Sequence, residues 1–331
     1  PGCYAQTDEL IELAKVVAKH KGHYASHIRN EGSGLLTAID EAIRIGREAG
    51  LPVHISHMKA GSRSIWGKSA DAIALIEQAR KKGQVVTADQ YPYIASSTSV
   101  QAMLIPSRWR EGTQKDLLAR LDDSETGPKI KEGIEKLISE RKAGDSIRIA
   151  RYAKQPAWQG KTLAAIAKAE GKSVLDVVLE IEHNGGASAV SFGMNEEDVR
   201  LIMKQSWVAT ASDGSAMVPG DTVPHPRSYG TFPRKLALYS LELKIVPLEQ
   251  AIRSASGLPA DILRLTDRGY LKPGQAADIV VFDPKTFRDT ATFDKPHQYA
   301  TGVKYLFVNG KPVIEADKYN GARAGKVLRM R

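Results

Sequence analysis

Two histidines stand at the same point of two successive predicted strands. His27 lies where the strand predicted within residues 22–31 (GHYASHIRNE) gives way to a loop. His57 lies 30 residues further on, where the strand predicted within residues 52–59 (PVHISHMK) does the same. A third strand, VVTADQYPY, places Asp89 32 residues beyond His57. Imidazoles held rigidly at strand ends are common metal ligands, but a lone histidine of this kind is more often a structural hydrogen-bonding group. On spacing alone, the matched pair supports a metal site and a pair of structural histidines equally well.

The elements that must position these histidines repeat at a constant interval. One amphipathic helix lies between them, since apolar or small residues recur at helical spacing: Leu36, Ile39, Ile43 and Gly46. A strand–helix–strand unit that recurs about every 30 residues is typical of a parallel sheet or a (β/α) barrel. In a barrel, the carboxyl ends of the strands meet at one mouth, where the chemistry lies. We interpret His23 and His54, earlier on the same strands, as core or helix-facing residues.

The composition restricts the class of protein. The chain has 331 residues, 42% of them hydrophobic, which suffices for one large domain and a smaller one. No apolar run approaches the roughly 18 residues of a membrane span, and the net charge of +9 comes from scattered Lys and Arg interleaved with Asp and Glu. We therefore expect neither a membrane protein nor a nucleic-acid-binding protein. The single cysteine, Cys3, excludes an internal disulfide and favours a cytoplasmic location.

The regular interval between strands breaks at about Ser97. The next segment that resembles a barrel strand is WVATASDG, residues 207–214. The stretch from about 98 to 190 is predicted to be mostly helical and is too long for a loop, so we interpret it as an insertion over the barrel mouth. After it the chain returns to the barrel, which we expect to occupy residues 1–267. Short β segments broken by Asn-Gly and Pro-Gly turns then predict a small β-sandwich segment over residues 268–331.

Two further charged residues lie where they can take part in chemistry. Asp213 ends the last predicted barrel strand, and a carboxylate at a barrel mouth can take a proton from water and pass it to a leaving nitrogen. An Asp-Gly pair is also common in turns without chemistry, so both interpretations of Asp213 remain open. Lys59 lies two residues beyond His57, where a cation suits an anionic substrate group, although a solvated lysine is the usual case.

Several segments carry a resemblance to a known family. In chain order they are YAQTDEL, SHIRNE, ISHMK, DQYPYIASST, ASDG, HPRSYGTFPR and LKPGQAADIVVFDP. Together they strongly resemble the N-acyl-D-amino-acid deacylases (D-aminoacylases) of the amidohydrolase superfamily. The likeness runs in order over essentially the whole chain, and the segments are specific as a set rather than one by one. The resemblance implies the later half of a (β/α)8 TIM-type barrel with a helical insertion, and part of a β-sandwich domain.

The resemblance also implies roles for individual residues. His27 and His57 would bind zinc, with one or two ions in the whole enzyme, and Asp213 would be the catalytic acid and base as well as a metal ligand. Two nitrogens on one zinc ion place the two imidazoles within about 4 Å of each other. The substrate carboxylate and acyl carbonyl would be bound by four residues: Lys59, Arg227, Tyr93 and Ser97. The reaction implied is metal-dependent hydrolysis of the amide of an N-acyl-D-amino acid, a small-molecule substrate.

The chain also departs from the family pattern. The family's H-x-H motif and its metal-bridging cysteine have no counterpart, and we interpret Cys3 as incidental because it precedes the YAQTDEL segment. We therefore expect a C-terminal portion of a longer enzyme, with any targeting signal upstream of Pro1. Only two histidines would then bind the metal, fewer than the three protein ligands usual in catalytic zinc sites. We expect residues 1–331 alone to be inactive.

Two other functions remain open at this stage. One is a cyclic-amide hydrolase of the hydantoinase or dihydroorotase type, against which the ISHMK, HPR and YPY segments argue. The other is a non-catalytic remnant that keeps the fold and binds no metal. Direct metal analysis of the purified chain would separate the remnant from both enzymes.

Overall fold

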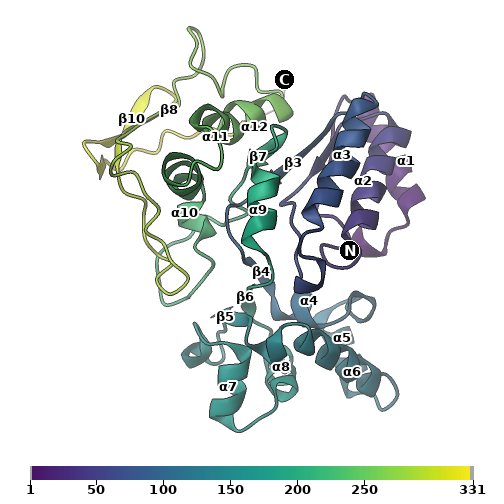
Figure 1. Ribbon diagram of the computed structural model, residues 1–331. Coiled ribbons are helices and arrows are strands. Elements are labelled where there is room, and N and C mark those ends of the chain that lie inside the picture. Colours follow the sequence, from purple (N-terminus) through teal and green to yellow (C-terminus); the bar gives the residue numbers. More distant parts are fainter. Residues whose placement is uncertain (1, 329–331) are drawn as a thin grey trace.

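The computed structural model of the chain describes residues 2–328, without the side chain of Cys3. Our interpretation of Cys3 as incidental thus concerns a side chain outside what the structure describes. Three β-sheets organise the described residues (Figure 1). A parallel sheet lies at the centre, an antiparallel sheet with its own helices lies below it, and a second antiparallel sheet lies near the C-terminal end of the chain.

The central sheet is parallel and has four strands in the order β1–β2–β3–β7. They are β1 (Tyr24–Ser26), β2 (Val53–Ile55), β3 (Val86–Gln90) and β7 (Val208–Thr210). The register pairs Ser26 with Ile55 and Ile55 with Ala88, so the carboxyl ends of these strands lie at one edge of the sheet. The helices that precede or connect the strands are α1 (Thr7–Lys19), α2 (Leu35–Ala49), α3 (Ser69–Lys81) and α9 (Glu196–Met203).

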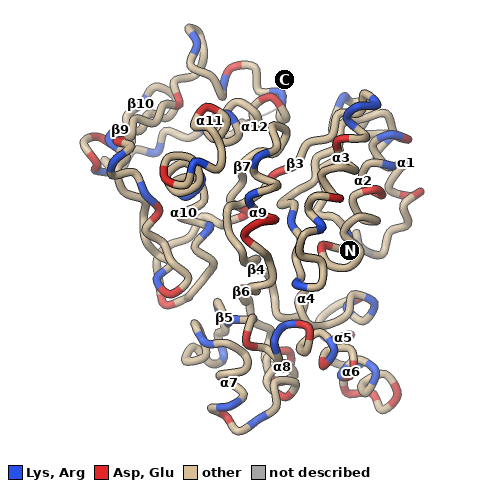
Figure 2. The backbone as a smooth tube through the Cα atoms, in the orientation of Figure 1, with Lys and Arg blue, Asp and Glu red and all other residues tan. Residues whose placement is uncertain are grey.

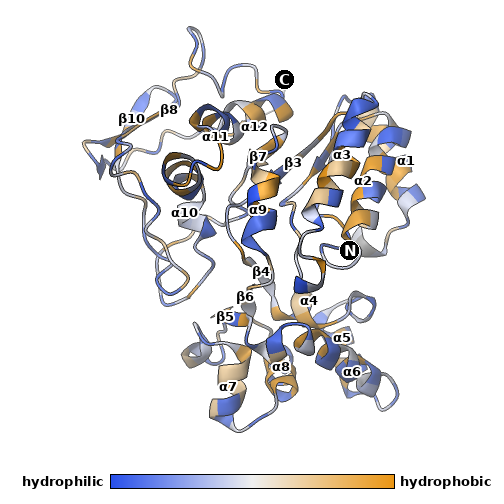
Figure 3. Ribbon diagram, in the orientation of Figure 1, coloured by the Kyte–Doolittle hydropathy of each residue, from blue (hydrophilic) through white to orange (hydrophobic). Residues whose placement is uncertain are grey.

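Helix α2 shows why these helices cover the sheet. Its apolar residues recur at helical spacing, and Ile39 and Ile43 are buried in the core that α2 and α3 share with the strands. Gly46 allows close approach to β2, because a Cβ atom there would lie only 2.1 Å from Cγ2 of Val53. Gly50 follows the helix in the left-handed conformation, with φ of 70°. Hydrophobic and hydrophilic residues accordingly alternate around α1, α2 and α3 (Figure 3).

The two faces of β2 carry different side chains. Val53 and Ile55 are buried among the helices, and His54 between them points to the opposite face because side chains alternate along a strand. There His54 hydrogen-bonds to Thr87 and Asp89 of β3. We interpret His54 as a core or helix-facing residue, and its side chain, which is only 13% exposed, lies on the face of the sheet opposite α2 and α3.

The segment between β3 and α9 forms a body of its own. Its sheet has the order β4–β6–β5 and is antiparallel: β4 (Ser96–Ser99), β5 (Ile147–Arg151) and β6 (Ser188–Ser191). Its helices are α4 (Val100–Leu104), α5 (Gln114–Asp122), α6 (Thr126–Ser139), α7 (Leu163–Glu170) and α8 (Val174–His183). We predicted helices in this stretch but missed β4 and β5. Both are short, and their pairing with β6 joins residues far apart in sequence, which no local pattern reveals.

The chain after β7 returns to the central sheet and then forms the C-terminal sheet. Its helices are α10 (Arg227–Arg234), the π-helix η6 (Lys235–Glu242), α11 (Leu248–Ala255) and α12 (Gly257–Ile262). The antiparallel strands that follow are β8 (Ile279–Phe282), β9 (Val303–Val308), β10 (Lys311–Glu315) and β11 (Lys318–Tyr319). Asn309 and Gly310 join β9 to β10 with φ of 50° and 77°, as a two-residue hairpin with positive φ at both positions requires.

The charged residues are spread over the surface. Figure 2 shows Lys and Arg close to Asp and Glu along most of the helices. Among residues 2–328, no helix combines the length and the apolar character that a membrane span needs.

Candidate metal and active site

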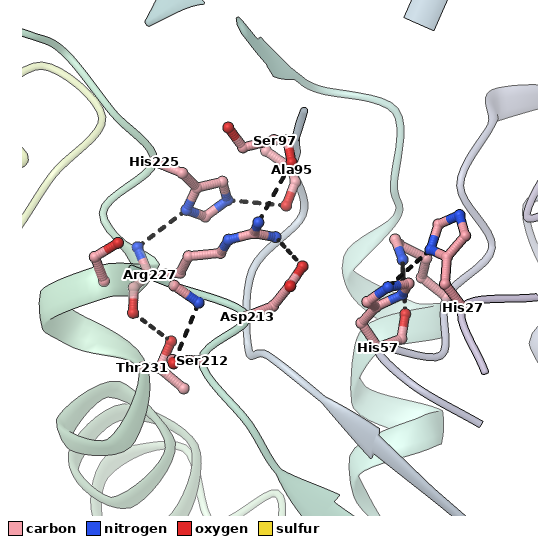
Figure 4. Close-up of polar contacts among 12 residues, drawn as sticks. His27, His57, Ala95, Ser97, Ser212, Asp213, His225, Arg227 and Thr231 are labelled. Atoms are coloured by element: carbon pink, nitrogen blue, oxygen red, sulfur yellow. Dashed lines mark hydrogen bonds and ion pairs between the residues drawn. The ribbon is translucent and has the colours of Figure 1, made fainter. Parts of the chain in front are cut away.

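The two predicted histidines meet at the carboxyl edge of the central sheet. His27 directly follows β1 and His57 lies two residues beyond β2. Nδ1 of His27 is 2.8 Å from Nε2 of His57 (Figure 4), which confirms the prediction that the two imidazoles lie within about 4 Å of each other. Because neighbouring parallel strands are in register here, equal spacing along the sequence becomes proximity in space. The role of the pair in metal binding remains a prediction.

A carboxylate that we did not predict completes this group. Oε1 of Glu31 lies 2.9 Å from Nδ1 of His57 and 3.9 Å from Nδ1 of His27. These three residues, which we call the His–Glu–His cluster, offer ligand atoms that all lie within 4.8 Å of one another. Imidazole nitrogens and carboxylate oxygens are donors that zinc accepts, so the group fits such an ion. Glu31 belongs to the SHIRNE segment, but the sequence provided no sign that the glutamate turns back toward the histidine four residues before it.

Lys59 is buried beside this cluster. Its Nζ contacts Oε1 of Glu31, and it lies 2.7 Å from both Nδ1 and the carbonyl oxygen of His57. Burial by itself would raise the pKa of the Glu31 carboxyl, but Lys59 and His57 together outweigh it and lower that pKa from 4.5 to about 2. The ammonium group thus holds Glu31 ionised. The polar contacts of Lys59 in the described residues are to Glu31 and His57, and its predicted contact to the substrate stays a prediction.

The surroundings of His27 favour the neutral imidazole that a metal ligand needs. Partial burial lowers the pKa of His27, and the neighbouring His57 and Lys59 lower it further, against the opposing effects of Glu31 and Asp213. A neutral imidazole keeps a free nitrogen lone pair for coordination.

Asp213 lies near the cluster but is paired elsewhere. It is three residues past β7, because pairing with β3 ends at Thr210, and the strand is therefore shorter than predicted. Oδ2 of Asp213 forms an ion pair of 2.8 Å with Nη1 of Arg227. In Figure 4 this pair faces His57 and His27 from the other side of the site. In the described residues the cluster consists of His27, Glu31 and His57, so Asp213 is not one of its members. The predicted contact of Asp213 with the metal stays a prediction.

The HPR segment places Arg227 through its histidine. Nδ1 of His225 accepts the backbone N–H of Arg227 at 3.0 Å, so its Nε2 carries the proton that is donated to the carbonyl of Ala95 at 2.9 Å. Burial lowers the pKa of His225 to about 3, which keeps this neutral form. The guanidinium of Arg227 also donates to the carbonyl of Ser97 at 3.3 Å, and the hydroxyl of Ser97 donates to Ala189 of β6. Thus Ser97 presents its backbone rather than its hydroxyl to this side of the site.

The ring of Tyr91, rather than that of Tyr93, lies close to both Arg227 and Lys59. The centroid of the Tyr91 ring is 4.6 Å from Cζ of Arg227 and 5.7 Å from Nζ of Lys59. Its hydroxyl is buried and has no hydrogen-bond partner among the described residues. Tyr93 instead packs against His225 and under Arg234. The buried hydroxyl of Tyr93 likewise has no hydrogen-bond partner among the described residues, and its role in substrate binding stays a prediction. Nothing in the YPY segment reveals that the Tyr91 ring is the one that contacts Arg227.

Comparison with known proteins identifies the family. The model of the amidohydrolase family matches residues 13–314. The chain belongs to this family. A relative, the D-aminoacylase of Alcaligenes xylosoxydans xylosoxydans, is 37% identical over 328 residues, which are 99% of this chain and 59% of that protein. The chain thus spans about three-fifths of the length of this amidohydrolase.

Solved structures of amidohydrolases support the same fold. The N-acyl-D-glutamate deacylase of Bordetella bronchiseptica, in complex with zinc and a phosphonate inhibitor, is 35% identical with a TM-score of 0.81, over 99% of this chain and 60% of that one. The D-hydantoinase of Bacillus sp. AR9 is 13% identical with a TM-score of 0.51, over 97% of this chain and 63% of that one, which shows the fold alone. The predicted fold class, an incomplete (β/α)8 barrel with further elements, is confirmed.

Proposed function

We propose that the protein to which this chain belongs hydrolyses the amide bond of N-acyl-D-amino acids, releasing a D-amino acid and a carboxylate. One observation carries the proposal: the His–Glu–His cluster faces the ion pair of Asp213 and Arg227 across the site. A metal centre opposite a carboxylate and a guanidinium suits hydrolysis of an amide in an anionic substrate. The relatives at 35–37% identity are deacylases of such substrates, whereas the likeness to a hydantoinase extends to the fold only.

The metal would be zinc, held by residues of the cluster. The similar deacylase of Bordetella bronchiseptica was solved with zinc, and the cluster offers two imidazoles and one carboxylate. Zinc at this position supplies Lewis acidity toward water and toward the acyl carbonyl. Glu31 has a second role open to it, since a histidine that ligates a metal usually donates its other N–H to a carboxylate, and Nδ1 of His57 already lies 2.9 Å from Glu31.

Asp213 would move the proton. As a carboxylate it can take a proton from the attacking water and deliver it to the leaving amide nitrogen. Asp213 has a φ of 47°, in the left-handed region, and Arg227 holds one of its oxygens. This ion pair orients the carboxylate without committing both of its oxygens.

Arg227 would bind the carboxylate of the substrate. Its guanidinium is buried, held by Asp213 and Ser97, and stacked over the ring of Tyr91. A rigid guanidinium can bind a carboxylate through two parallel hydrogen bonds. The unpartnered hydroxyl of Tyr91 would donate a further hydrogen bond, and the ammonium of Lys59, 5.7 Å from the centroid of the same ring, would contribute positive charge.

Asp213→Asn in the full-length protein tests this proposal. Turnover of N-acetyl-D-amino acids should fall by about 10²–10⁴-fold, the contribution typical of an acid–base group, while bound zinc measured by metal analysis is retained. Asp289→Asn is the matched control, because it removes the carboxylate that pairs with Arg234 at 3.3 Å outside the cluster. Near-normal turnover by Asp213→Asn would rule out the acid–base role. Turnover of hydantoins in place of linear N-acyl-D-amino acids would overturn the proposed substrate class.

A further inference from the structure

Asp89 lies directly behind His57 and holds its backbone. Oδ1 of Asp89 accepts the backbone N–H of His57 at 2.7 Å, and its carbonyl oxygen accepts the backbone N–H of Met58 at 2.8 Å. Oδ2 is 2.7 Å from Nε2 of His54, whose Nδ1 is 2.8 Å from Oγ1 of Thr87. A row of three polar side chains thus runs up the face of the sheet opposite α2 and α3 and ends on the backbone of a residue in the cluster.

The conformation of His57 explains why such a support is needed. Its φ is 39°, in the left-handed region that residues with a Cβ atom rarely adopt. The chain leaves β2 at Ile55, so the ladder with β3 no longer determines the direction of the backbone at this point. Oδ1 of Asp89 replaces the missing ladder partner, and a hydrogen bond from an amide to a carboxylate is among the stronger kinds.

We propose that Asp89, itself held by His54, is a positioning residue that fixes the left-handed turn at His57 and thereby aims its imidazole at His27. The inference rests on the metal site of the proposed function, but not on the substrate or on proton transfer. Its consequence is that zinc affinity depends on a carboxylate that is not a member of the His–Glu–His cluster. Loss of such supporting groups typically weakens metal binding about 10–100-fold.

The alternative is that Asp89 only stabilises the fold. A second buried carboxylate serves as a control that distinguishes this structural role from the positioning role. Asp198 of α9 is also a buried carboxylate that accepts two backbone N–H groups: that of Gly67, in the loop after β2, at 2.8 Å and that of Ser69, at the start of α3, at 3.3 Å. Its hydrogen bonds among the described residues do not reach the cluster. Asp198→Ala should therefore lower stability without changing zinc affinity.

The experiment compares variants of the full-length protein for zinc dissociation constant, by competition with a chromogenic chelator, and for urea unfolding midpoint. Asp89→Ala and Asp89→Leu, which removes the acceptor with little loss of volume, should each weaken zinc binding about 10–100-fold. Asp89→Asn should recover most of the affinity, because its amide oxygen can still accept the N–H of His57. In the zinc-free wild type, the amide proton of His57 should be protected from hydrogen exchange, a measurement that needs no variant.

The outcomes distinguish the two proposals. Zinc dissociation constants that stay unchanged in Asp89→Ala or Asp89→Leu, or that rise equally in Asp198→Ala, would overturn the positioning role while leaving the deacylase proposal intact. An unprotected amide of His57 in the wild type would do the same. A wild-type protein that binds no zinc would overturn the metal site and this inference with it.

Discussion

The ion pair between Glu31 and Lys59 predicts how the stability of the protein responds to one substitution and to pH. The side chain of Lys59 is only 4% exposed, and the carboxylate of Glu31 is its ion-pair partner. The fall of the Glu31 pKa from 4.5 to about 2 corresponds to about 3 kcal/mol of stability, since one pKa unit is about 1.4 kcal/mol. Because the folded pKa is the lower one, this stability is fully present above pH 4.5 and is lost as the pH falls toward 2.

Glu31→Gln tests this reasoning. The amide keeps the shape of the side chain but leaves the ammonium of Lys59 buried without a charge partner, so the free energy of unfolding at pH 7 should fall by about 3 kcal/mol. The assay is urea unfolding of zinc-free protein in the presence of a chelator, at pH 7 and at pH 3. The difference between variant and wild type should be smaller at pH 3, where part of the advantage of the ionised carboxyl is already lost.

Two controls make the result specific. Glu12→Gln removes an exposed partner of Lys15 and should cause no measurable change. Lys59→Met combined with Glu31→Gln should cost less than the sum of the single substitutions, because the second change removes the charge that the first leaves unpaired. A Glu31→Gln variant as stable as wild type at pH 7, or a loss of equal size at both pH values, would refute the account of this ion pair.

Three further predictions follow from the site and from one buried cation. Arg227→Met should raise KM for the free N-acyl-D-amino acid but not for its carboxylate ester; an equal effect on both would refute the carboxylate contact. Tyr91→Phe should lower kcat/KM by about 10–100-fold, as loss of a hydrogen bond to a charged group does, whereas Tyr93→Phe should leave it unchanged; the reverse order in steady-state assays would contradict the assignment. Lys235 is buried, and its Nζ donates to the carbonyl of Met203 at 3.4 Å. Burial lowers the pKa of Lys235 from 10.5 to about 8, so Lys235→Met should raise stability at pH 7 by up to about 3 kcal/mol. Urea unfolding should show this gain shrinking between pH 8 and 10.5, because the wild type becomes more stable there as its folded and then its unfolded state lose the proton.

The sequence by itself determined the repeating units and the pairing of the two histidines. Apolar spacing on α2 and the interval of 30 residues between His27 and His57 are local patterns. Neighbouring parallel strands in register convert such an interval into contact at one edge of the sheet. The hairpin turn at Asn309 and Gly310 could also be predicted from a local pattern, because its backbone conformation depends on the two residues themselves.

Only the tertiary structure decided which polar side chains meet beyond the strand ends. Glu31 returns to His57 from a loop, Tyr91 rather than Tyr93 turns toward Arg227, and Asp89 supports the backbone of His57 from the neighbouring strand. Side-chain directions repeat regularly along a helix or a strand, but they follow no such repeat in a loop, where the backbone takes conformations such as the left-handed turn at His57. These contacts depend on distances between elements far apart in the chain, which are set only when the helices and sheets have packed.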